Sequence, residues 1–92
     1  MTVTIRRQLT IINKLGLHAR AAAKLVNLAS SFDAELVLRR EEREVNAKSI
    51  MGVMMLAASQ GITLEVEATG EDASLAIKQL ELLVAQRFGE PE

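Results

Sequence analysis

Apolar residues recur along this chain at two spacings, every second residue in some segments and every third or fourth in others. Ile62, Leu64, Val66 and Ala68 alternate with polar residues, which is typical of a strand with one buried face. The same alternation predicts strands over residues 4–12 and 34–38 and a short strand around Val45. The charged residues 40–43 would form the hairpin turn between the second and third strands.

The wider spacing predicts three helices, over residues 19–31, 50–58 and 73–84. Ser49 is placed to cap the start of the second helix, and Gly61 is placed to stop it. Asp72 is placed to cap the start of the third helix. The apolar stripe of that helix comprises Ala73, Ala76, Ile77, Leu80, Leu83 and Val84. The predicted element order is therefore βαββαβα.

Each predicted strand has one polar face, and three helices carry the apolar surface that could cover the other. This balance predicts a two-layer α+β domain with an open-faced antiparallel sheet. Periodicity does not give the pairing order of the strands, and it equally allows a ferredoxin-like sheet with an added helix. Residues 1–92 contain no linker or repeat, so we expect a single domain that ends in a frayed Gly89-Glu-Pro-Glu tail.

Composition excludes several classes of function. The 92 residues include no cysteine and one histidine, which excludes thiol catalysis, disulfides and Cys/His metal sites. A net charge of −1 and the lack of Trp and Tyr argue against nucleic-acid binding. The longest apolar stretch, residues 50–58, is far shorter than the roughly 20 residues that span a bilayer, and the start lacks a signal-peptide pattern. We therefore expect a cytoplasmic protein without membrane insertion.

The most informative segment lies between the first predicted strand and the first predicted helix. Gly16 permits a tight turn there, and His18 follows at the helix start, where backbone N–H groups without intrahelical partners favour an anion. A neutral imidazole at that point is a nucleophile suited to a phosphoryl group. Arg20 could reach the same oxygens with its planar guanidinium, while Lys14 and Lys24 add diffuse positive potential.

The residues alone leave a plainer interpretation open. A lone histidine near a helix start is more often solvated or capping, and Arg20 taken by itself is most often a surface side chain. No Ser-His-Asp set or carboxylate pair can be argued from spacing, and no carboxylates group around His18 in the sequence. We expect neither a metal nor a cofactor.

Two motifs together with the element order resemble a known family. Gly16-Leu-His-Ala-Arg-Ala-Ala and Asn46-Ala-Lys-Ser-Ile-Met-Gly-Val-Met are similar to those of HPr, the histidine-containing phosphocarrier of the bacterial phosphoenolpyruvate-dependent phosphotransferase system. The resemblance implies a sheet of order 1-4-2-3 under three helices. It also implies that Enzyme I phosphorylates His18 on Nδ1, that Arg20 assists, and that a IIA domain receives the group. Such a protein is a carrier and not an enzyme.

The second motif has a structural and a functional interpretation. Ser49 suits a helix N-cap. By resemblance it also matches the regulatory serine that an HPr kinase/phosphorylase phosphorylates. Apolar residues at helical spacing are by default core, yet Val53, Leu56 and Ala57 already offer a buried face. By resemblance, the partner-binding surface comprises Ala23, Lys24, Lys48, Ile50, Met51 and Met54.

The chain departs from the commonest form of this family in having Ala21 where proline usually follows the arginine. The alanine, the run from Ile11 to His18 and the Arg87-Phe-Gly-Glu ending resemble HPr-like proteins of Gram-negative bacteria, including the nitrogen-related NPr branch. We expect a monomer. The alternative function is a ferredoxin-like, ligand-binding regulatory domain without phosphoryl transfer, in which His18 would be structural.

Overall fold

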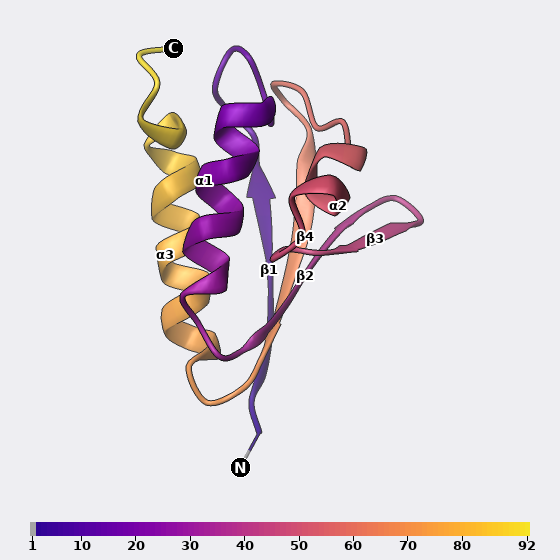
Figure 1. Cartoon of the computed structure of the whole chain (residues 1–92), viewed down its shortest axis with the longest axis vertical. Coiled ribbons are helices and arrows are strands. Elements are labelled where there is room, and N and C mark those ends of the chain that lie inside the picture. Colours follow the sequence, from indigo (N-terminus) through magenta and orange to yellow (C-terminus); the bar gives the residue numbers. More distant parts are fainter. Residues whose placement is uncertain (1) are drawn as a thin grey trace.

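The computed structural model describes residues 2–92 and contains the seven predicted elements in the predicted order (Figure 1). The strands are β1 (Thr4–Thr10), β2 (Glu35–Arg40), β3 (Arg43–Asn46) and β4 (Thr63–Thr69). The helices are α1 (Ala19–Ser30), α2 (Ile50–Met55) and α3 (Ala73–Ala85), and a 3-10 turn, η1 (Arg87–Gly89), follows α3. The hairpin expected at the charged turn is formed by β2 and β3.

The strands form one antiparallel sheet of order β1-β4-β2-β3. This is the order that the resemblance to HPr implies, and it settles the pairing that periodicity left open. Leu64 of β4 pairs with Leu9 of β1, and Val66 pairs with Leu38 of β2, so the apolar positions of neighbouring strands fall on one face.

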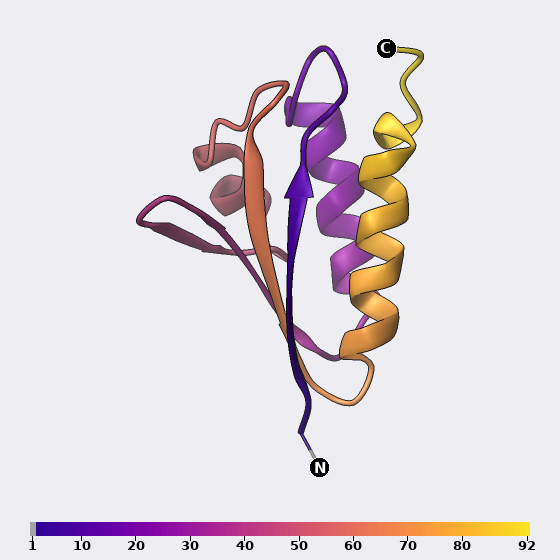
Figure 2. The same cartoon turned by 180° about the vertical axis from the view of Figure 1, so that it is seen from behind.

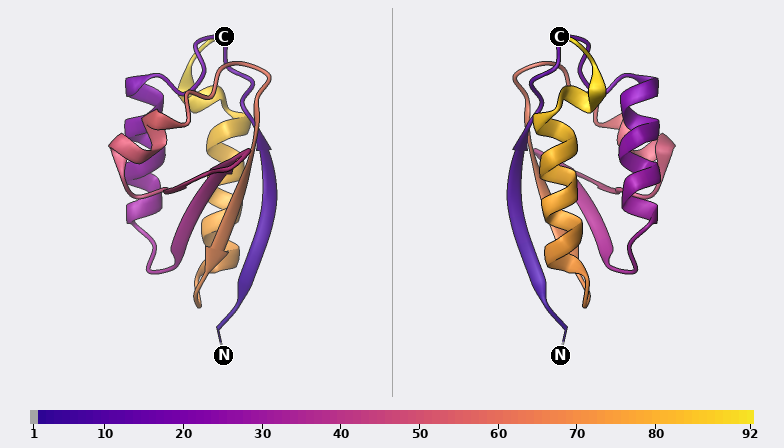
Figure 3. Two further views of the ribbon diagram at one scale, coloured as in Figure 1. Left: turned by 90° about the vertical axis from the view of Figure 1, so that its right-hand side faces the viewer. Right: turned by 90° about the vertical axis from the view of Figure 1, so that its left-hand side faces the viewer.

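All three helices cover that apolar face, with α1 and α3 side by side over the sheet (Figures 1 and 3). The view from behind shows the strands nearer the viewer than α1 (Figure 2). Within residues 2–92 the longest helix, α3, has 13 residues, so none of the helices could cross a bilayer.

The second helix is shorter than predicted. It ends at Met55, because Leu56 and Ala57 donate their N–H groups to Val53 and Met54 in tight 3-10 bonds of 3.2 and 3.1 Å. Ala57 takes a φ of 49° and is exposed, so it is not part of the buried face of the helix. The prediction that Gly61 stops this helix is wrong.

Gly61 instead belongs to the junction between β1 and β4. Its N–H donates to the carbonyl of Ile11 at 2.7 Å, and the N–H of Ile11 donates to Ile62 at 2.9 Å. β1 ends at Thr10 and not at residue 12, but Ile11 continues its hydrogen bonding and is fully buried.

Asp72 has the predicted N-cap position but not the predicted role. Its carboxylate forms no capping bond with α3. It accepts the backbone N–H groups of Asp33 and Ala34 at 2.8 Å each, and the pKa of Asp72 is lowered chiefly by the bond from Asp33. The start of α3 is thereby tied to the segment that enters β2.

The C-terminal tail is not frayed, in contrast to the expectation from its composition. Phe88 is buried at 1% exposure in contact with the helical layer, and its carbonyl accepts Lys24 Nζ at 2.6 Å. The N–H of Lys14 donates to the carbonyl of Glu92 at 3.0 Å. The tail therefore runs back to the loop between β1 and α1.

Candidate functional site

His18 occupies the N-cap position of α1, as the sequence predicts, and its side chain makes no capping bond. The loop before it is held from two sides. The N–H of Gly16 donates to the carbonyl of Asn13 at 3.2 Å, and the N–H of Leu17 donates to that of Ala58 at 2.8 Å. Because this loop is anchored to the segment before β4, the imidazole has a defined place. The His18 side chain is 30% exposed.

A carboxylate from the far end of the chain contacts the imidazole. Glu90 Oε2 accepts a hydrogen bond from His18 Nε2, and Glu90 Oε1 accepts one from Asn13 Nδ2 at 2.9 Å. Asn13 Nδ2 also donates to the carbonyl of Gly16 at 2.8 Å. The three side chains thus form a continuous series from a fully buried amide to a partly exposed imidazole.

The charge of this carboxylate determines which imidazole nitrogen carries the proton. The hydrogen bond from Asn13, and after it the bond from His18, hold the pKa of Glu90 below its usual value. An ionised carboxylate only accepts hydrogen bonds, so His18 Nε2 must be the donor. In the neutral ring, Nδ1 is then the nitrogen with a free lone pair.

The surroundings of the imidazole favour an incoming anion. The first intrahelical bond of α1 runs from the N–H of Ala22 to the carbonyl of His18, so the N–H groups before it belong to the electropositive helix end. Ala21 keeps one of these N–H groups, which a proline would lack. Arg20 is exposed and lines, with His18, Lys14 and Glu90, an open hollow of about 360 Å³.

The three basic residues expected near His18, Lys14, Arg20 and Lys24, differ in what their side chains contact. Lys14 and Arg20 border its hollow, as expected. The Nζ of Lys24 is instead bound to the carbonyl of Phe88, where it fixes the tail. Lys24 therefore acts on the site partly through the chain end that it holds, a contact that no spacing in the sequence indicates.

Glu90 is the residue in contact with His18 that the sequence alone does not indicate. No carboxylates group around His18 in the sequence, but folding brings one, Glu90, to it from 72 positions away. The sequence signal that includes Glu90 is the Arg87-Phe-Gly-Glu ending, which resembles HPr-like proteins of Gram-negative bacteria. Within residues 2–92 no three His, Asp or Glu side chains come close enough together to hold a metal ion.

The second motif caps a helix and exposes apolar side chains. Ser49 Oγ accepts the N–H of Gly52 at 3.2 Å, which confirms the predicted N-cap of α2. Val53 is buried, whereas Ile50, Met51 and Met54 are 38%, 71% and 42% exposed. The exposed residues lie on a helix that packs against α1. Their exposure fits a docking surface and not the core position that helical spacing suggests by default.

The two remaining residues expected in that surface differ from each other. Ala23 lies half-buried on α1. Lys48 is partly buried, and its Nζ donates to the carbonyl of Phe32 at 2.6 Å, so it joins the start of α2 to the end of α1.

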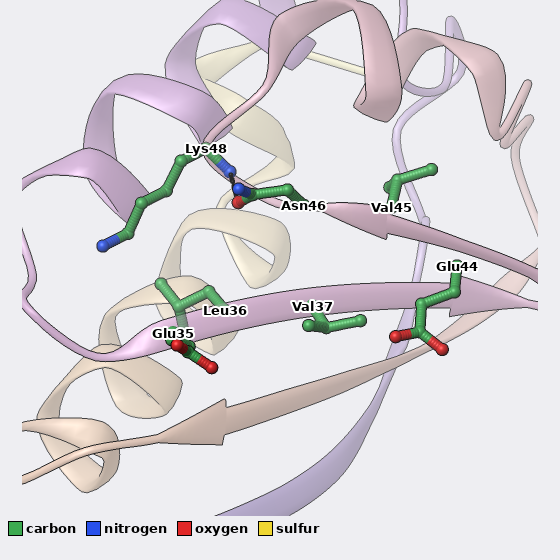
Figure 4. A pocket seen from close by; sticks show the side chains of 7 residues that line it. All are labelled: Glu35, Leu36, Val37, Glu44, Val45, Asn46 and Lys48. Atoms are coloured by element: carbon green, nitrogen blue, oxygen red, sulfur yellow. Dashed lines mark hydrogen bonds between the residues drawn. The ribbon is translucent and has the colours of Figure 1, made fainter.

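A second hollow lies away from the histidine, beside β2 and β3 (Figure 4). It has a volume of about 410 Å³ and is lined by Val37 and Val45 together with the carboxylates Glu35 and Glu44. Neither His18 nor Arg20 borders it. This hollow lacks the nucleophile and the electropositive helix end that characterise the site at α1.

Known proteins are similar to this chain in sequence and in fold. The sequence family described as "PTS HPr component phosphorylation site" matches residues 5–86. The chain is 54% identical over 88 residues to the phosphocarrier protein HPr of Cupriavidus necator, covering 96% of this chain and 99% of that protein. It is 45% identical over 86 residues to the phosphocarrier protein NPr of Shewanella violacea, covering 94% of each. The crystal structure of HPr-C-His from Thermoanaerobacter tengcongensis matches with a TM-score of 0.87 and 44% identity, over 100% of this chain and 99% of that one.

The chain is an open-faced sandwich with one histidine at a helix start. Together with the similarity to these relatives, this fold and site define a small phosphocarrier domain. The chain belongs to the HPr family of the phosphotransferase system. Proteins of this family are carriers and not catalysts, which is the role expected from the resemblance. Both HPr and NPr occur among its relatives.

Proposed function

We propose that this protein is a histidine phosphocarrier that accepts a phosphoryl group on Nδ1 of His18 from phospho-Enzyme I and passes it to a IIA domain. The observation that carries the proposal is the bond from His18 Nε2 to the Glu90 carboxylate, because it leaves the lone pair on Nδ1. The electropositive start of α1 and the exposed guanidinium of Arg20 support it, since both favour phosphoryl oxygens.

The transfer needs no group beyond the two reacting proteins. The Nδ1 lone pair forms a bond to phosphorus while the bond between phosphorus and the donor atom breaks, and that electron pair stays with the donor. Enzyme I supplies most of the positioning, and His18 supplies an accessible nucleophile. In the onward step the nitrogen–phosphorus bond breaks and the acceptor on the IIA domain takes the group.

The partner proteins bind the exposed apolar side chains of α2 and the adjacent part of α1. Ile50, Met51 and Met54 present a flexible apolar surface that suits more than one partner. Lys24 and Lys48 hold the neighbouring backbone, and Ala23 completes the surface on α1. A small surface of this kind permits the rapid release that a cytoplasmic, monomeric carrier between two partners requires.

Ser49 is the proposed regulatory phosphorylation site, modified by an HPr kinase/phosphorylase. Its hydroxyl already lies at the start of α2, where a phosphate would be electrostatically favoured, so modification would leave the helix folded. The added charge would stand beside Ile50 and Met51 and would weaken apolar docking.

The experiment that tests the proposed function is intact-protein mass spectrometry after incubation with phosphoenolpyruvate, Mg²⁺ and Enzyme I. We expect one added phosphate that is lost in acid, and none on His18→Ala. Incubation with ATP and the kinase should instead add an acid-stable phosphate that Ser49→Ala lacks. A wild-type chain that takes no phosphate from Enzyme I would favour the ligand-binding alternative.

A further inference from the structure

The tail of the chain is held at several points, which gives Glu90 a fixed position. Phe88 is buried, and its carbonyl accepts Lys24 Nζ at 2.6 Å. Two residues beyond Glu90, the carbonyl of Glu92 accepts the N–H of Lys14 at 3.0 Å. Anchors on both sides and a side chain only 14% exposed show that the contact between Glu90 and His18 is built into the fold.

We propose that Glu90 is a positioning residue for phosphoryl transfer: oriented by Asn13, it holds His18 in the tautomer with the proton on Nε2 and balances the positive charge that the ring acquires. This inference rests on the proposed function, because it assigns a role to Glu90 in that same reaction. The positively charged groups near this carboxylate are Lys14, Arg20 and Lys24, and the second carboxylate bordering the hollow is Glu92.

The role follows from the charge balance of the reaction. When Nδ1 of the neutral ring forms its bond to phosphorus, the proton stays on Nε2 and the ring becomes positively charged. A carboxylate on Nε2 stabilises that charge as it develops. In the onward transfer the nitrogen–phosphorus electron pair returns to Nδ1, and the ring leaves as neutral imidazole. A ring without the Nε2 proton would have to leave as an imidazolate anion, which is a far poorer leaving group.

Asn13 gives the proposal a sharp consequence for the isosteric variant Glu90→Gln. Asn13 Nδ2 donates both to the Gly16 carbonyl and to residue 90, so the amide oxygen of a glutamine would have to face Asn13. The NH₂ group of the glutamine would then face His18 and donate to Nε2. This bond would move the ring proton to Nδ1 and remove the nucleophilic lone pair.

The test measures the tautomer separately from the transfer. ¹⁵N NMR of the imidazole at mildly alkaline pH should show an unprotonated Nδ1 in the wild type, a protonated Nδ1 in Glu90→Gln, and a mixture in Glu90→Ala. The initial rate of phosphoryl acceptance from Enzyme I should fall by about tenfold or more in Glu90→Gln, and by less in Glu90→Ala. The control is Glu71→Gln, an exposed carboxylate at the opposite end of α3, which should match the wild type in both measurements.

The outcomes separate the two proposals. An unchanged tautomer or an unchanged acceptance rate in Glu90→Gln, with the amide spectrum of the sheet preserved, overturns the role of Glu90. A wild-type chain that accepts no phosphate overturns the proposed function, and the NMR measurement then still decides whether Glu90 determines the tautomer.

Discussion

Asn13 is a fully buried polar side chain at the point where the β1–α1 loop meets the tail. Its Nδ2 has two acceptors, Gly16 and Glu90, but its Oδ1 has no hydrogen-bond partner within residues 2–92. An unpaired buried acceptor costs about 1–3 kcal/mol. An apolar residue would avoid that cost but could not orient Glu90, so the choice of residue follows the site and not the stability of the core.

Gly16 is the residue whose missing side chain brings the site loop against the segment before β4. Its φ is +68°, and a Cβ there would lie 2.6 Å from the carbonyl oxygen of Ala58 and 2.8 Å from Ser59 Cα. We expect Gly16→Ala to lower the free energy of unfolding by about 3 kcal/mol or more, because backbone strain and a clash with fixed backbone add. Urea denaturation followed by circular dichroism measures the loss.

Gly61→Ala is the matched control for this prediction. Gly61 also has a positive φ, +91°, but no atom lies within 4 Å of the position a Cβ would take. Its substitution should cost only the backbone strain, about 1 kcal/mol. Equal losses for the two variants would contradict the close approach at Gly16.

The open face of the sheet carries an ion-pair network across the strands. Arg39 of β2 donates to Glu44 of β3 and to Glu65 and Glu67 of β4, at 2.9–3.5 Å. Arg6 of β1 also donates to Glu67, at 2.6 Å. The network therefore links all four strands on the face that no helix covers.

The network makes stability depend on pH through Glu67. Hydrogen bonds from Arg6 first, and from Arg39 second, lower the pKa of Glu67 from its usual 4.5. A carboxyl with a depressed pKa in the fold contributes stability above pH 4.5 and loses it as the pH falls through the folded value. Glu67→Gln should thus be less stable than the wild type at neutral pH and should lose less stability on acidification.

Urea denaturation at neutral pH and at about pH 3 tests this difference. Other carboxyls with depressed pKa values, Asp72 and Glu90, act in both proteins, so the comparison isolates Glu67. The control is Glu81→Gln, an exposed carboxylate of α3, which should keep the wild-type acid dependence. The prediction fails if Glu67→Gln loses as much stability on acidification as the wild type.

At the scale of the whole molecule, the C-terminal segment packs against the loop between β1 and α1. The C-terminus lies at the same end as the β1–α1 loop in every view (Figures 1–3). Lys14, Lys24 and Asn13 all bind groups of the last five residues. The site is therefore complete only when the segment after α3 has packed against the start of α1.

Phe88 anchors this closure. We expect Phe88→Ala to lower the free energy of unfolding by about 3–5 kcal/mol, because it removes a buried aromatic ring. It should also increase hydrogen exchange of the Lys14 amide, whose acceptor is the carbonyl of Glu92. Chemical denaturation and hydrogen-exchange NMR measure the two effects.

Leu82→Ala provides the comparison for Phe88→Ala. Leu82 lies on the outer face of α3 and is 50% exposed, so its truncation should change stability by no more than about 0.5 kcal/mol. A loss for Phe88→Ala as small as that for Leu82→Ala would mean that the tail does not contribute to the core.

Local patterns in the chain were enough to predict the seven elements, the layer arrangement, and the positions of His18 and Ser49 at helix starts. These features depend on periodicity and capping, which act over a few residues and can be seen in sequence order. The strand order and the family came from motif resemblance, and the structure and the comparisons confirm both.

The partners of the site residues were decided only by tertiary packing. Asp72 binds Asp33 and Ala34 instead of capping α3, and Glu90 reaches His18 and Asn13 across most of the chain. No spacing encodes such contacts, because they exist only once the sheet and the helices have brought distant backbone together. For the same reason the tail looks disordered in sequence but is ordered in the fold: its anchor, Phe88, has a place to pack only against the assembled helical layer.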